Sequence, residues 1–273
     1  MTQLAEIDSA VVRAFDSLAA NYDSIFTSSA IGRSQRDVVW NRILSVFRSG
    51  RHVLELNCGT GVDALFMASA GLRVTACDAS LRMIEIGQKR VADAMERESI
   101  EFLNVATEEL RSLPTELHFD GLFSNFAGLN CVRDLNSVVR QAALRLRPGA
   151  PLLLCFLSRF CLWEIVYYLL RGKPRYAFRR CGGASVAHLG DLSFPVFYPP
   201  LSELCKTFAP EFRLVSAVGV GITVPPSYLE PWIARHPKLL RCMESIDNHI
   251  RAIPGLRLVG DHLLLHFEKV GTC

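Results

Sequence analysis

The sequence predicts an α/β fold built on a doubly wound, mostly parallel sheet. Three observations support this prediction. Short apolar runs alternate with segments of helical length between residues 52 and 157, a rhythm typical of parallel strands covered by helices on both faces. A glycine-rich turn follows the first apolar run. An alternating apolar segment, residues 261–267, closes the chain and is expected to form its last strand.

The elements of this core follow in a regular order. Two helices are expected before the first strand, over residues 8–20 and 33–48; in the second, Val39, Ile43 and Val46 lie close to helical spacing. Strands are expected at residues 52–56, 73–77, 100–104, 120–126 and 151–157, and helices at residues 62–69, 80–95 and 135–146. Arg147, Pro148 and Gly149 end the last of these helices, because this sequence is a helix stop signal.

The regular order breaks after residue 158. An aromatic-rich helix (160–170), a basic, glycine-rich loop (to residue 190) and a proline-rich stretch (194–200) intervene. A helix (201–208) and a strand (212–218) then resume the pattern. A second insertion, residues 225–258, carries another helix. These two interruptions predict cap structures added to the sheet.

Composition and charge narrow the class of protein. Half of the residues are hydrophobic and the mean hydropathy is +0.22, which argues against disorder. The net charge of +3 is low for a nucleic-acid-binding protein. Six basic residues and one acid lie between residues 159 and 180. This cluster fits a solvated face, an anionic substrate or a membrane surface.

The cysteines and the N-terminus bear on the compartment. The nine cysteines form no C-x-x-C pair, and no histidine pair has zinc-finger spacing. We therefore expect no structural metal and a reducing cytoplasm. The first ten residues contain acids and no apolar core, so we expect no signal peptide there.

The most apolar segment, residues 151–170, contains only Arg159 and Glu164 as charges. A membrane span would look similar, but two charges within it would be costly. A buried strand that leads into an apolar helix explains the same residues. Because the 160–170 helix is apolar nearly all round, we expect it to be buried against the second insertion, a partner subunit or a lipid surface. Oligomerisation and peripheral membrane contact are both open.

The strongest local signal is HVLELNCGTGVDA, residues 52–64. A strand carrying Glu55 leads into a turn with Gly59 and Gly61, and a helix follows. Glycines let the backbone approach a ligand closely, and the helix N-terminus presents unpaired N–H groups. The second strand ends at Asp78, whose carboxylate can accept both hydroxyls of a ribose. Together these features predict an adenosine site at the C-terminal ends of the strands.

The acid before the turn indicates which adenosine cofactor binds. The turn fits G-x-G-x-x-A, the dinucleotide fingerprint, which is a weak signal when taken alone. Glu55 would repel a pyrophosphate, whereas its charge suits the cationic amino-acid end of S-adenosylmethionine. S-adenosylmethionine is therefore the expected cofactor.

The same segment resembles motif I of the class I S-adenosylmethionine-dependent methyltransferases, written E-x-G-x-G-x-G. Four further segments resemble other elements of this family: the N-terminal Tyr-Asp element (20–23), the acidic strand end with its adenine-covering residues (77–84), the fourth-strand motif (119–126) and the turn before the fifth strand (147–150). The resemblance implies a seven-stranded sheet of order 3-2-1-4-5-7-6 whose last strand is antiparallel. It also implies S-adenosylhomocysteine as the product.

This resemblance suggests how the chain divides. Residues 1–50 are expected to form an N-terminal helical lid, and residues 51–158 the Rossmann-like core that binds S-adenosylmethionine. Residues 159–198 would be a substrate cap insertion. Residues 199–273 would complete the core and carry the second insertion, residues 225–258.

The expected cofactor-binding residues follow from these motifs and, for Arg36, from its place on the helix before the first strand. They are Tyr22, Arg36, Glu55, Asn57, Cys58, Gly59, Gly61, Asp78, Ala79, Met83, Ala106, Thr107, Asn125 and Phe126. Two positions depart from the family pattern. Asn57 replaces the first glycine of motif I, although asparagine tolerates left-handed backbone better than other non-glycine residues. Ala106 stands where the family usually has an Asp that receives the adenine amino group, so this contact is expected from backbone, Thr107 or Glu108.

The acceptor is expected above the fourth and fifth strand ends, beneath the two insertions. Their aromatic and aliphatic residues indicate a small, hydrophobic or amphiphilic molecule. Direct methyl transfer depends on positioning, and a base is needed only if the acceptor loses a proton. The candidate acid–base residues are His188, Asp191 and Tyr198, and the candidate substrate contacts are Asn130, Trp163 and Tyr167. Arg33 or Arg36 is expected to reach the cofactor carboxylate or the substrate; a solvated or structural role is the alternative for all of these side chains.

Three functions are compatible with this pattern. O- or C-methylation of a small molecule is the main hypothesis. A relative of the same fold that binds S-adenosylmethionine but catalyses cyclisation or elimination is the second. A non-catalytic binding protein is the third, which intact Glu55, Gly59 and Asp78 disfavour. Methylation of nucleic acid is disfavoured because residues 124–127, Ser-Asn-Phe-Ala, lack the Asn/Asp-Pro-Pro-aromatic pattern of amino-base methyltransferases.

Overall fold

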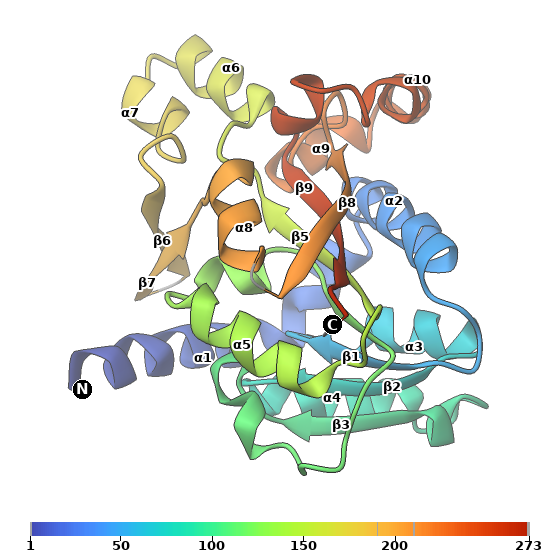
Figure 1. Ribbon diagram of the computed structural model, residues 1–273. Coiled ribbons are helices and arrows are strands. Elements are labelled where there is room, and N and C mark those ends of the chain that lie inside the picture. The colour runs from blue at the N-terminus through green and yellow to red at the C-terminus, as the bar shows by residue number, and fades with distance from the viewer. Residues whose placement is uncertain (1, 190, 210, 272–273) are drawn as a thin grey trace.

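Seven strands of the described residues form one sheet in the order β3-β2-β1-β4-β5-β9-β8 (Figure 1). The computed structural model describes residues 2–189, 191–209 and 211–271. The strands are β1 (His52–Leu56), β2 (Arg73–Asp78), β3 (Ile100–Asn104), β4 (Gly121–Ser124), β5 (Pro151–Leu157), β8 (Phe212–Val220) and β9 (His262–Lys269). β9 runs antiparallel to β5 and β8, and the other neighbouring pairs are parallel. The predicted fold, with its antiparallel last strand, is confirmed.

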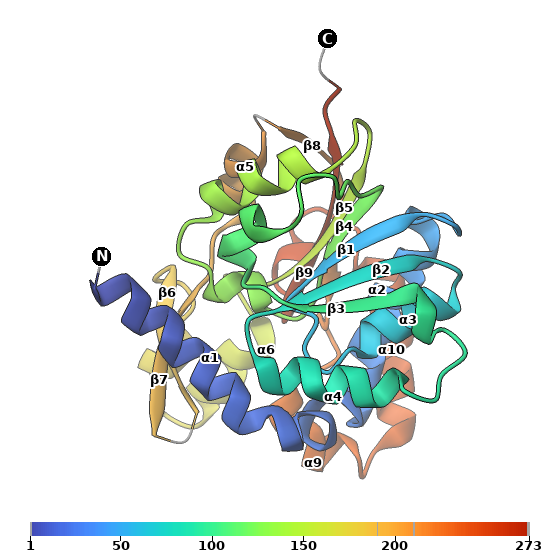
Figure 2. The same cartoon turned by 90° about the horizontal axis from the view of Figure 1, so that it is seen from below.

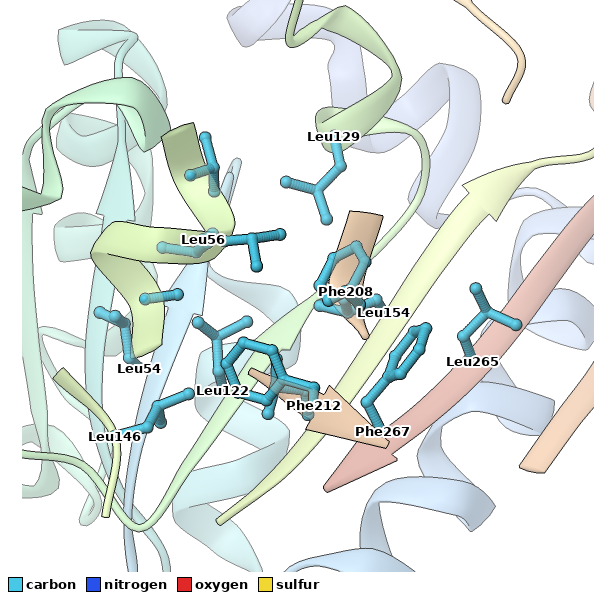
Figure 3. Close-up of a cluster of buried hydrophobic side chains, with 14 of the residues drawn as sticks. Leu54, Leu56, Leu122, Leu129, Leu146, Leu154, Phe208, Phe212, Leu265 and Phe267 are labelled. Atoms are coloured by element: carbon cyan, nitrogen blue, oxygen red, sulfur yellow. The ribbon is translucent and has the colours of Figure 1, made fainter. Parts of the chain in front are cut away.

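Helices cover both faces of this sheet. α5 (Leu135–Arg145) and α8 (Leu201–Phe208) pack on one face, in a core that includes Leu54, Leu56 and Phe208 (Figure 3). α2 (Ala30–Val46), α3 (Val62–Ser69) and α4 (Leu81–Val91) cover the other face, over Val53. Because side chains alternate along a strand, β1 turns Glu55 toward this second face, between α2 and α3. Short helical turns join these elements, over Asp23–Thr27, Arg97–Ser99, Thr107–Ser112, Gly128–Cys131, Ser227–Leu229 and Leu256–Leu258.

α1 (Thr2–Tyr22) and a two-stranded hairpin lie outside the sheet. The hairpin consists of β6 (Ala184–Leu189) and β7 (Leu192–Phe197). Figure 2 shows α1 alongside α4 and across the hairpin, where Phe194 and Val196 pack with Ala14. The prediction of a loop and a proline-rich stretch here is wrong. Pro195 occurs within β7, which a two-stranded ribbon tolerates because an edge strand can leave a backbone position without an N–H donor.

Four helices gather at the end of the molecule toward which β5 runs: α6 (Leu162–Leu170), α7 (Pro174–Ala177), α9 (Glu230–Ile233) and α10 (Pro237–Ile250) (Figure 1). In α6, Glu164 is buried but Leu162, Val166, Leu169 and Leu170 are exposed. Within the described chain only one side of α6 packs against other elements. Burial of the other side against a partner subunit or a lipid surface stays a prediction. No helix of the described residues combines the length and the apolar character needed to cross a bilayer.

Candidate active site

A cavity lies at the C-terminal ends of β1, β2 and β4, beneath α1, which is the edge where parallel α/β sheets bind their ligands. Its polar side includes Asp78 and Asn125, and its apolar side includes Val11, Phe15 and Cys131. The other lining residues are Val12, Tyr22, Asn57, Gly59, Ala79, Ser80, Met83, Phe126 and Gly128. One cavity thus offers both hydrogen-bonding groups and apolar surface.

The turn after β1 brings backbone up to the cavity. Asn57, Gly59 and Gly61 have φ angles of +54°, +54° and +72°, in the left-handed region that glycine and asparagine tolerate best. A Cβ at Gly61 would lie 2.8 Å from the Phe102 ring, whereas one at Gly59 would meet nothing of the described chain within 4 Å. Packing of the Phe102 ring therefore leaves no room for a side chain at position 61. At position 59 a side chain would have room, and the glycine leaves that space free at the cavity wall. The Asn57 side-chain oxygen accepts a hydrogen bond from Thr107 Oγ1 at 3.1 Å.

Asp78 ends β2, and its carboxylate lies against the turn that follows β1, at the cavity wall. The carboxylate accepts hydrogen bonds from the backbone N–H of Gly59 at 2.8 Å and of Ser80 at 2.9 Å. Burial raises the pKa of Asp78, and these two N–H groups oppose that rise. Because a carboxylate has about four lone-pair sites, Asp78 is oriented by the chain and can still accept hydrogen bonds from a ligand.

A buried group of charges adjoins the cavity; it consists of Arg36, Glu55 and Asp63 and is termed the pocket cluster. Arg36 pairs with Asp63 at 2.6 Å. Asp63 also accepts from Asn125 at 2.9 Å and from the Trp40 indole at 2.7 Å. Glu55 is 1% exposed, and its Oε2 has no hydrogen-bond partner in the described chain. Burial, and next the charge of Asp63, raises the pKa of Glu55 well above its ordinary value. The Arg36 guanidinium therefore pairs with Asp63, while its charge acts to lower the pKa of Glu55 without an ion pair between these two among the described residues.

Phe126 joins the pocket cluster to the cavity. Phe126 and Ala127 have φ angles of +41° and +68°, and two successive non-glycine residues in this region are strained, as is common at functional sites. The Arg36 guanidinium carbon lies 4.8 Å from the centre of the Phe126 ring. Phe26 and His262 meet the same ring edge-on, with centroid distances of 4.9 and 5.4 Å. The ring is therefore held between a cation and two other rings.

Two carboxylates tie the N-terminal segment over the cavity. Asp16, on α1, accepts a hydrogen bond from Ser80 Oγ at 2.5 Å. Asp23 pairs with Arg90 and accepts from Thr60 Oγ1 at 2.8 Å. Between them, Tyr22 lies on the cavity wall, and burial raises its pKa to about 12. α1 is therefore anchored by side chains that follow β1 and β2.

A second group of charges, buried except for Arg179, lies between α6 and the start of β9; it consists of Glu164, Arg179, Arg180 and Asp261 and is termed the cap cluster. Glu164 pairs with Arg179 at 2.7 Å and with Arg180 at 2.8 Å, and Arg180 pairs with Asp261 at 3.0 Å. Every guanidinium nitrogen of Arg180 has an acceptor. His262 follows, with Nδ1 3.5 Å from the Asp261 carboxylate and no hydrogen bond to that nitrogen among the described residues. Burial lowers the pKa of His262.

The structure brings most of the predicted cofactor residues to one place. Those that line the cavity are Tyr22, Asn57, Gly59, Asp78, Ala79, Met83, Asn125 and Phe126. Arg36 and Glu55 belong to the pocket cluster. The remaining four, Cys58, Gly61, Ala106 and Thr107, lie in the turns after β1 and β3. Arg33, by contrast, is exposed and donates to the Ser28 carbonyl.

The predicted acid–base residues lie away from the cavity lining. His188 is exposed on β6, with Nδ1 2.8 Å from Ser193 Oγ. Asp191 is exposed at the hairpin turn. Tyr198 is buried, and its hydroxyl is 3.1 Å from Ser185 Oγ. In this structure the three side chains belong to the hairpin and the segment after it.

The predicted substrate residues also make contacts outside the cavity lining. Asn130 accepts from the Leu157 N–H at 2.8 Å and donates to the Phe197 carbonyl at 2.6 Å, so it ties β5 to the hairpin. The Trp163 indole donates to the Thr223 carbonyl at 2.8 Å. Tyr167 packs against Tyr168 and Tyr228, with ring centroids 5.1 and 5.2 Å apart.

Asp63 and His262 contact the cavity residues Asn125 and Phe126, and the sequence analysis did not single them out. Asp63 stands two residues after Gly61, in the first turn of α3, so its place in the motif was an available signal. His262 had no local signal. It reaches Phe126 only because β9 pairs with β5, with His262 opposite Leu157 at the strand end.

Proteins similar to this chain carry methyltransferase names. Residues 53–149 match a family model described as a methyltransferase domain. A demethylmenaquinone methyltransferase from Mycobacterium marinum is 32% identical over 174 residues, which cover 61% of this chain and 69% of that protein. Another, from Paenarthrobacter aurescens, is 30% identical over 175 residues, which cover 61% of this chain. That match spans 64% of the Paenarthrobacter protein, slightly less than two thirds.

Solved structures share the fold. The 1,6-didemethyltoxoflavin-N1-methyltransferase of Burkholderia thailandensis, with bound S-adenosylhomocysteine, gives a TM-score of 0.60 at 16% identity and covers 98% of this chain and 90% of that one. The 4+2 cyclase SpnF gives a TM-score of 0.62 at 14% identity and covers 96% of each chain. At these identities the likeness establishes the fold alone.

Proposed function

Since the chain belongs to the class I S-adenosylmethionine-dependent methyltransferase family, we propose that it transfers a methyl group from S-adenosylmethionine to a small, hydrophobic or amphiphilic acceptor. One observation carries the proposal: a single cavity at the strand ends has a polar side with Asp78 and an apolar side with Val11 and Phe15. The polar side suits the cofactor, and the apolar side suits the acceptor. The demethylmenaquinone methyltransferases among the relatives support an acceptor of this kind.

The polar side fits S-adenosylmethionine in its donor and acceptor groups. Asp78 would hold the ribose hydroxyls, because its carboxylate faces the cavity and has lone pairs to spare. Glu55 would balance the ammonium group and Arg36 the carboxylate. A buried carboxylate oxygen without a partner is costly. The unpaired Oε2 of Glu55 within the described chain therefore favours a cationic ligand group beside it.

The chain contributes positioning and exclusion of water. When bound, S-adenosylmethionine supplies a methyl group on a positively charged sulfur, which an acceptor atom can take directly. Asp16 and Asp23 hold the N-terminal segment over the cavity, so the acceptor is enclosed next to the polar side. Orientation of two reactants in an enclosed site accounts for much of the rate of such a transfer.

For an acceptor that loses a proton, we propose His262 as the base in place of His188. Neither histidine is among the residues that line the cavity, but His262 lies edge-on to Phe126, which is, whereas His188 is exposed and bonded to Ser193. Burial lowers the pKa of His262 and so favours its neutral imidazole, while the charge of Asp261 opposes this shift. Asp261, beside Nδ1, would stabilise the imidazolium that forms.

The two histidines give a matched pair of variants. His262→Asn is expected to lower kcat by about 10²–10⁴ while cofactor affinity stays unchanged. His188→Ala is expected to retain full turnover. Turnover is measured with isotope-labelled cofactor, and thermal melting confirms that each variant folds. Loss of turnover in His188→Ala, with His262→Asn active, would return the role to His188.

Calorimetry and product analysis test the whole proposal. S-adenosylmethionine and S-adenosylhomocysteine are expected to bind with micromolar affinity and NAD not at all; binding of NAD alone would overturn the proposal. Labelled cofactor incubated with a pool of hydrophobic metabolites is expected to yield a labelled product, found by mass spectrometry. Conversion of a metabolite without release of S-adenosylhomocysteine would favour cyclisation or elimination, and SpnF shows that a cyclase can have this fold.

A further inference from the structure

Several apolar side chains of α6, α7 and α9 are exposed in the described chain. Leu170 is 83% exposed, Tyr176 55% and Leu162 49%. Val166, Leu169 and Trp232 are 42, 46 and 39% exposed. These six residues are termed the apolar face. Contiguous exposed apolar surface on a folded protein usually marks an interaction site.

Aromatic contacts hold the parts of this face in a fixed arrangement. Trp163 of α6 lies beside Trp232 of α9, with ring centroids 6.2 Å apart. Tyr168 of α6 stacks on Tyr176 of α7 at 5.6 Å. The two insertions therefore present one surface at the same end of the molecule (Figure 1).

Basic residues outnumber acidic ones in the segments that carry the apolar face. The acids of α6 and α9, Glu164 and Glu230, are already bound within the chain, Glu164 by Arg179 and Arg180 and Glu230 by the backbone N–H groups of Ala30 and Ile31. Residues 165–190 and 231–243 contain eight Lys and Arg and no Asp or Glu, although the whole chain has a net charge of only +3. Arg179 and Arg180 are already paired in the cap cluster. Arg171, Lys173 and Arg175 are exposed and form no ion pair with another described residue. The rest of the chain is net acidic, so this end is distinctly positive.

We propose that the apolar face docks on an anionic lipid bilayer. Aliphatic and aromatic side chains can enter the interfacial region while Lys and Arg contact anionic headgroups. A second copy of this chain is a poorer partner, because a two-fold contact through this face would bring like basic residues together. The docking proposal does not depend on the proposed reaction.

Docking through the apolar face would bring the cavity close to a membrane-dissolved acceptor. This consequence, unlike the docking itself, rests on the proposed function. α6 follows directly from the C-terminal end of β5, and the cavity lies at the same sheet edge. A docked molecule would therefore hold the edge that contains the cavity close to the membrane. A hydrophobic acceptor dissolved in the bilayer would reach the cavity from there.

Sedimentation with vesicles tests the docking without any substrate. The full chain is expected to sediment with vesicles of phosphatidylcholine and phosphatidylglycerol, to bind phosphatidylcholine alone weakly, and to be released by salt. Leu169→Glu with Leu170→Glu is expected to weaken vesicle binding at least tenfold. Leu144→Glu is the matched control, since Leu144 is 71% exposed on α5, and it is expected to bind like the wild type.

A second pair of variants tests the charges. Lys173→Ala and Arg175→Ala are each expected to weaken binding to anionic vesicles about fivefold. Arg82→Ala, whose side chain is 68% exposed on α4, is expected to have no effect. Absence of wild-type binding at low salt would overturn the proposal, as would equal losses in Leu144→Glu and the α6 variant. A dimer in solution that the α6 variant dissociates would also overturn it and make the face a subunit interface.

Discussion

The pocket cluster and the cap cluster are made from the same residue types but differ in how completely their members are paired. The cap cluster has two carboxylates and two guanidinium groups, and every nitrogen of Arg180 has an acceptor. The pocket cluster has two carboxylates and one guanidinium. Within the described chain, Glu55 Oε2 and Arg36 Nε have no partner.

This difference agrees with the proposed function, in which the cap cluster supports the fold and the pocket cluster takes part in binding the cofactor. Burying charges is costly unless each is paired and hydrogen-bonded. The cap cluster meets this condition with its own residues. The pocket cluster would meet it with a bound molecule that carries an ammonium group and a carboxylate, as the amino-acid end of S-adenosylmethionine does. The two clusters should therefore respond to substitution in opposite ways, one in stability and the other in ligand affinity.

The largest expected effect is on the stability of the cap cluster. Arg180→Met removes a buried guanidinium and leaves Glu164 and Asp261 underpaired, so the free energy of unfolding should fall by about 3–5 kcal/mol. Urea unfolding measures this loss. Arg179→Met is the matched control; its side chain is 38% exposed, and its ion pair is partly screened by solvent, so a loss of about 1 kcal/mol or less is expected. Equal losses in the two variants would show that the cap cluster does not depend on its buried arginine.

The next effect separates ligand affinity from stability. Asp78→Ala removes the acceptor expected to hold two ribose hydroxyls, each such charge-assisted hydrogen bond being worth about 1.5–3 kcal/mol. Affinity for S-adenosylmethionine should fall at least tenfold in calorimetry, while thermal melting still shows a folded protein. Asp191→Ala, at an exposed turn, is the control and should bind normally. Unchanged affinity in Asp78→Ala would mean that the ribose lies elsewhere.

The core was predictable from sequence where its features are local. The turn at Gly59 and Gly61 and the strand end at Asp78 depend on residues close in the chain, and β1, α3, β3, β5 and α8 have the predicted bounds. The cap depends on contacts between distant segments. The hairpin forms against α1, and His262 meets Phe126 through the pairing of β9 with β5.

The burial of α6 is a second feature that depends on distant segments and could not be predicted from the local sequence. Its apolar composition was evident, but composition does not reveal which side of a helix finds a partner. Glu164, the acidic residue of α6, is buried because Arg179 and Arg180 approach it from the following segment. Leu170 is left exposed. The sequence pattern left open what covers this helix and did not identify Glu164 as its buried residue.

The smallest expected effect concerns Glu55, for which the structure predicts the direction in which stability changes with pH. Its ordinary pKa is 4.5 and its pKa in the folded protein lies well above that value, so the folded state holds this proton more tightly than the unfolded state. The burial of Glu55 therefore costs little below about pH 4, and its cost grows as the pH rises from the unfolded pKa toward the folded one. Glu55→Gln removes this cost. Without cofactor, the variant should match the wild type at low pH and exceed its stability near pH 7.

With cofactor bound, the wild type should become more stable than Glu55→Gln near pH 7. A bound ammonium group would stabilise the ionised Glu55, so saturating S-adenosylmethionine should raise the melting temperature of the wild type more than that of Glu55→Gln, and the variant should bind about tenfold more weakly. Glu101→Gln, an exposed glutamate on β3, controls for loss of a strand carboxylate and should show neither effect. Melting curves at several pH values, with and without cofactor, decide the matter. If Glu55→Gln is less stable than the wild type near pH 7 and binds normally, Glu55 is a paired structural group like Glu164, and the distinction between the two clusters fails.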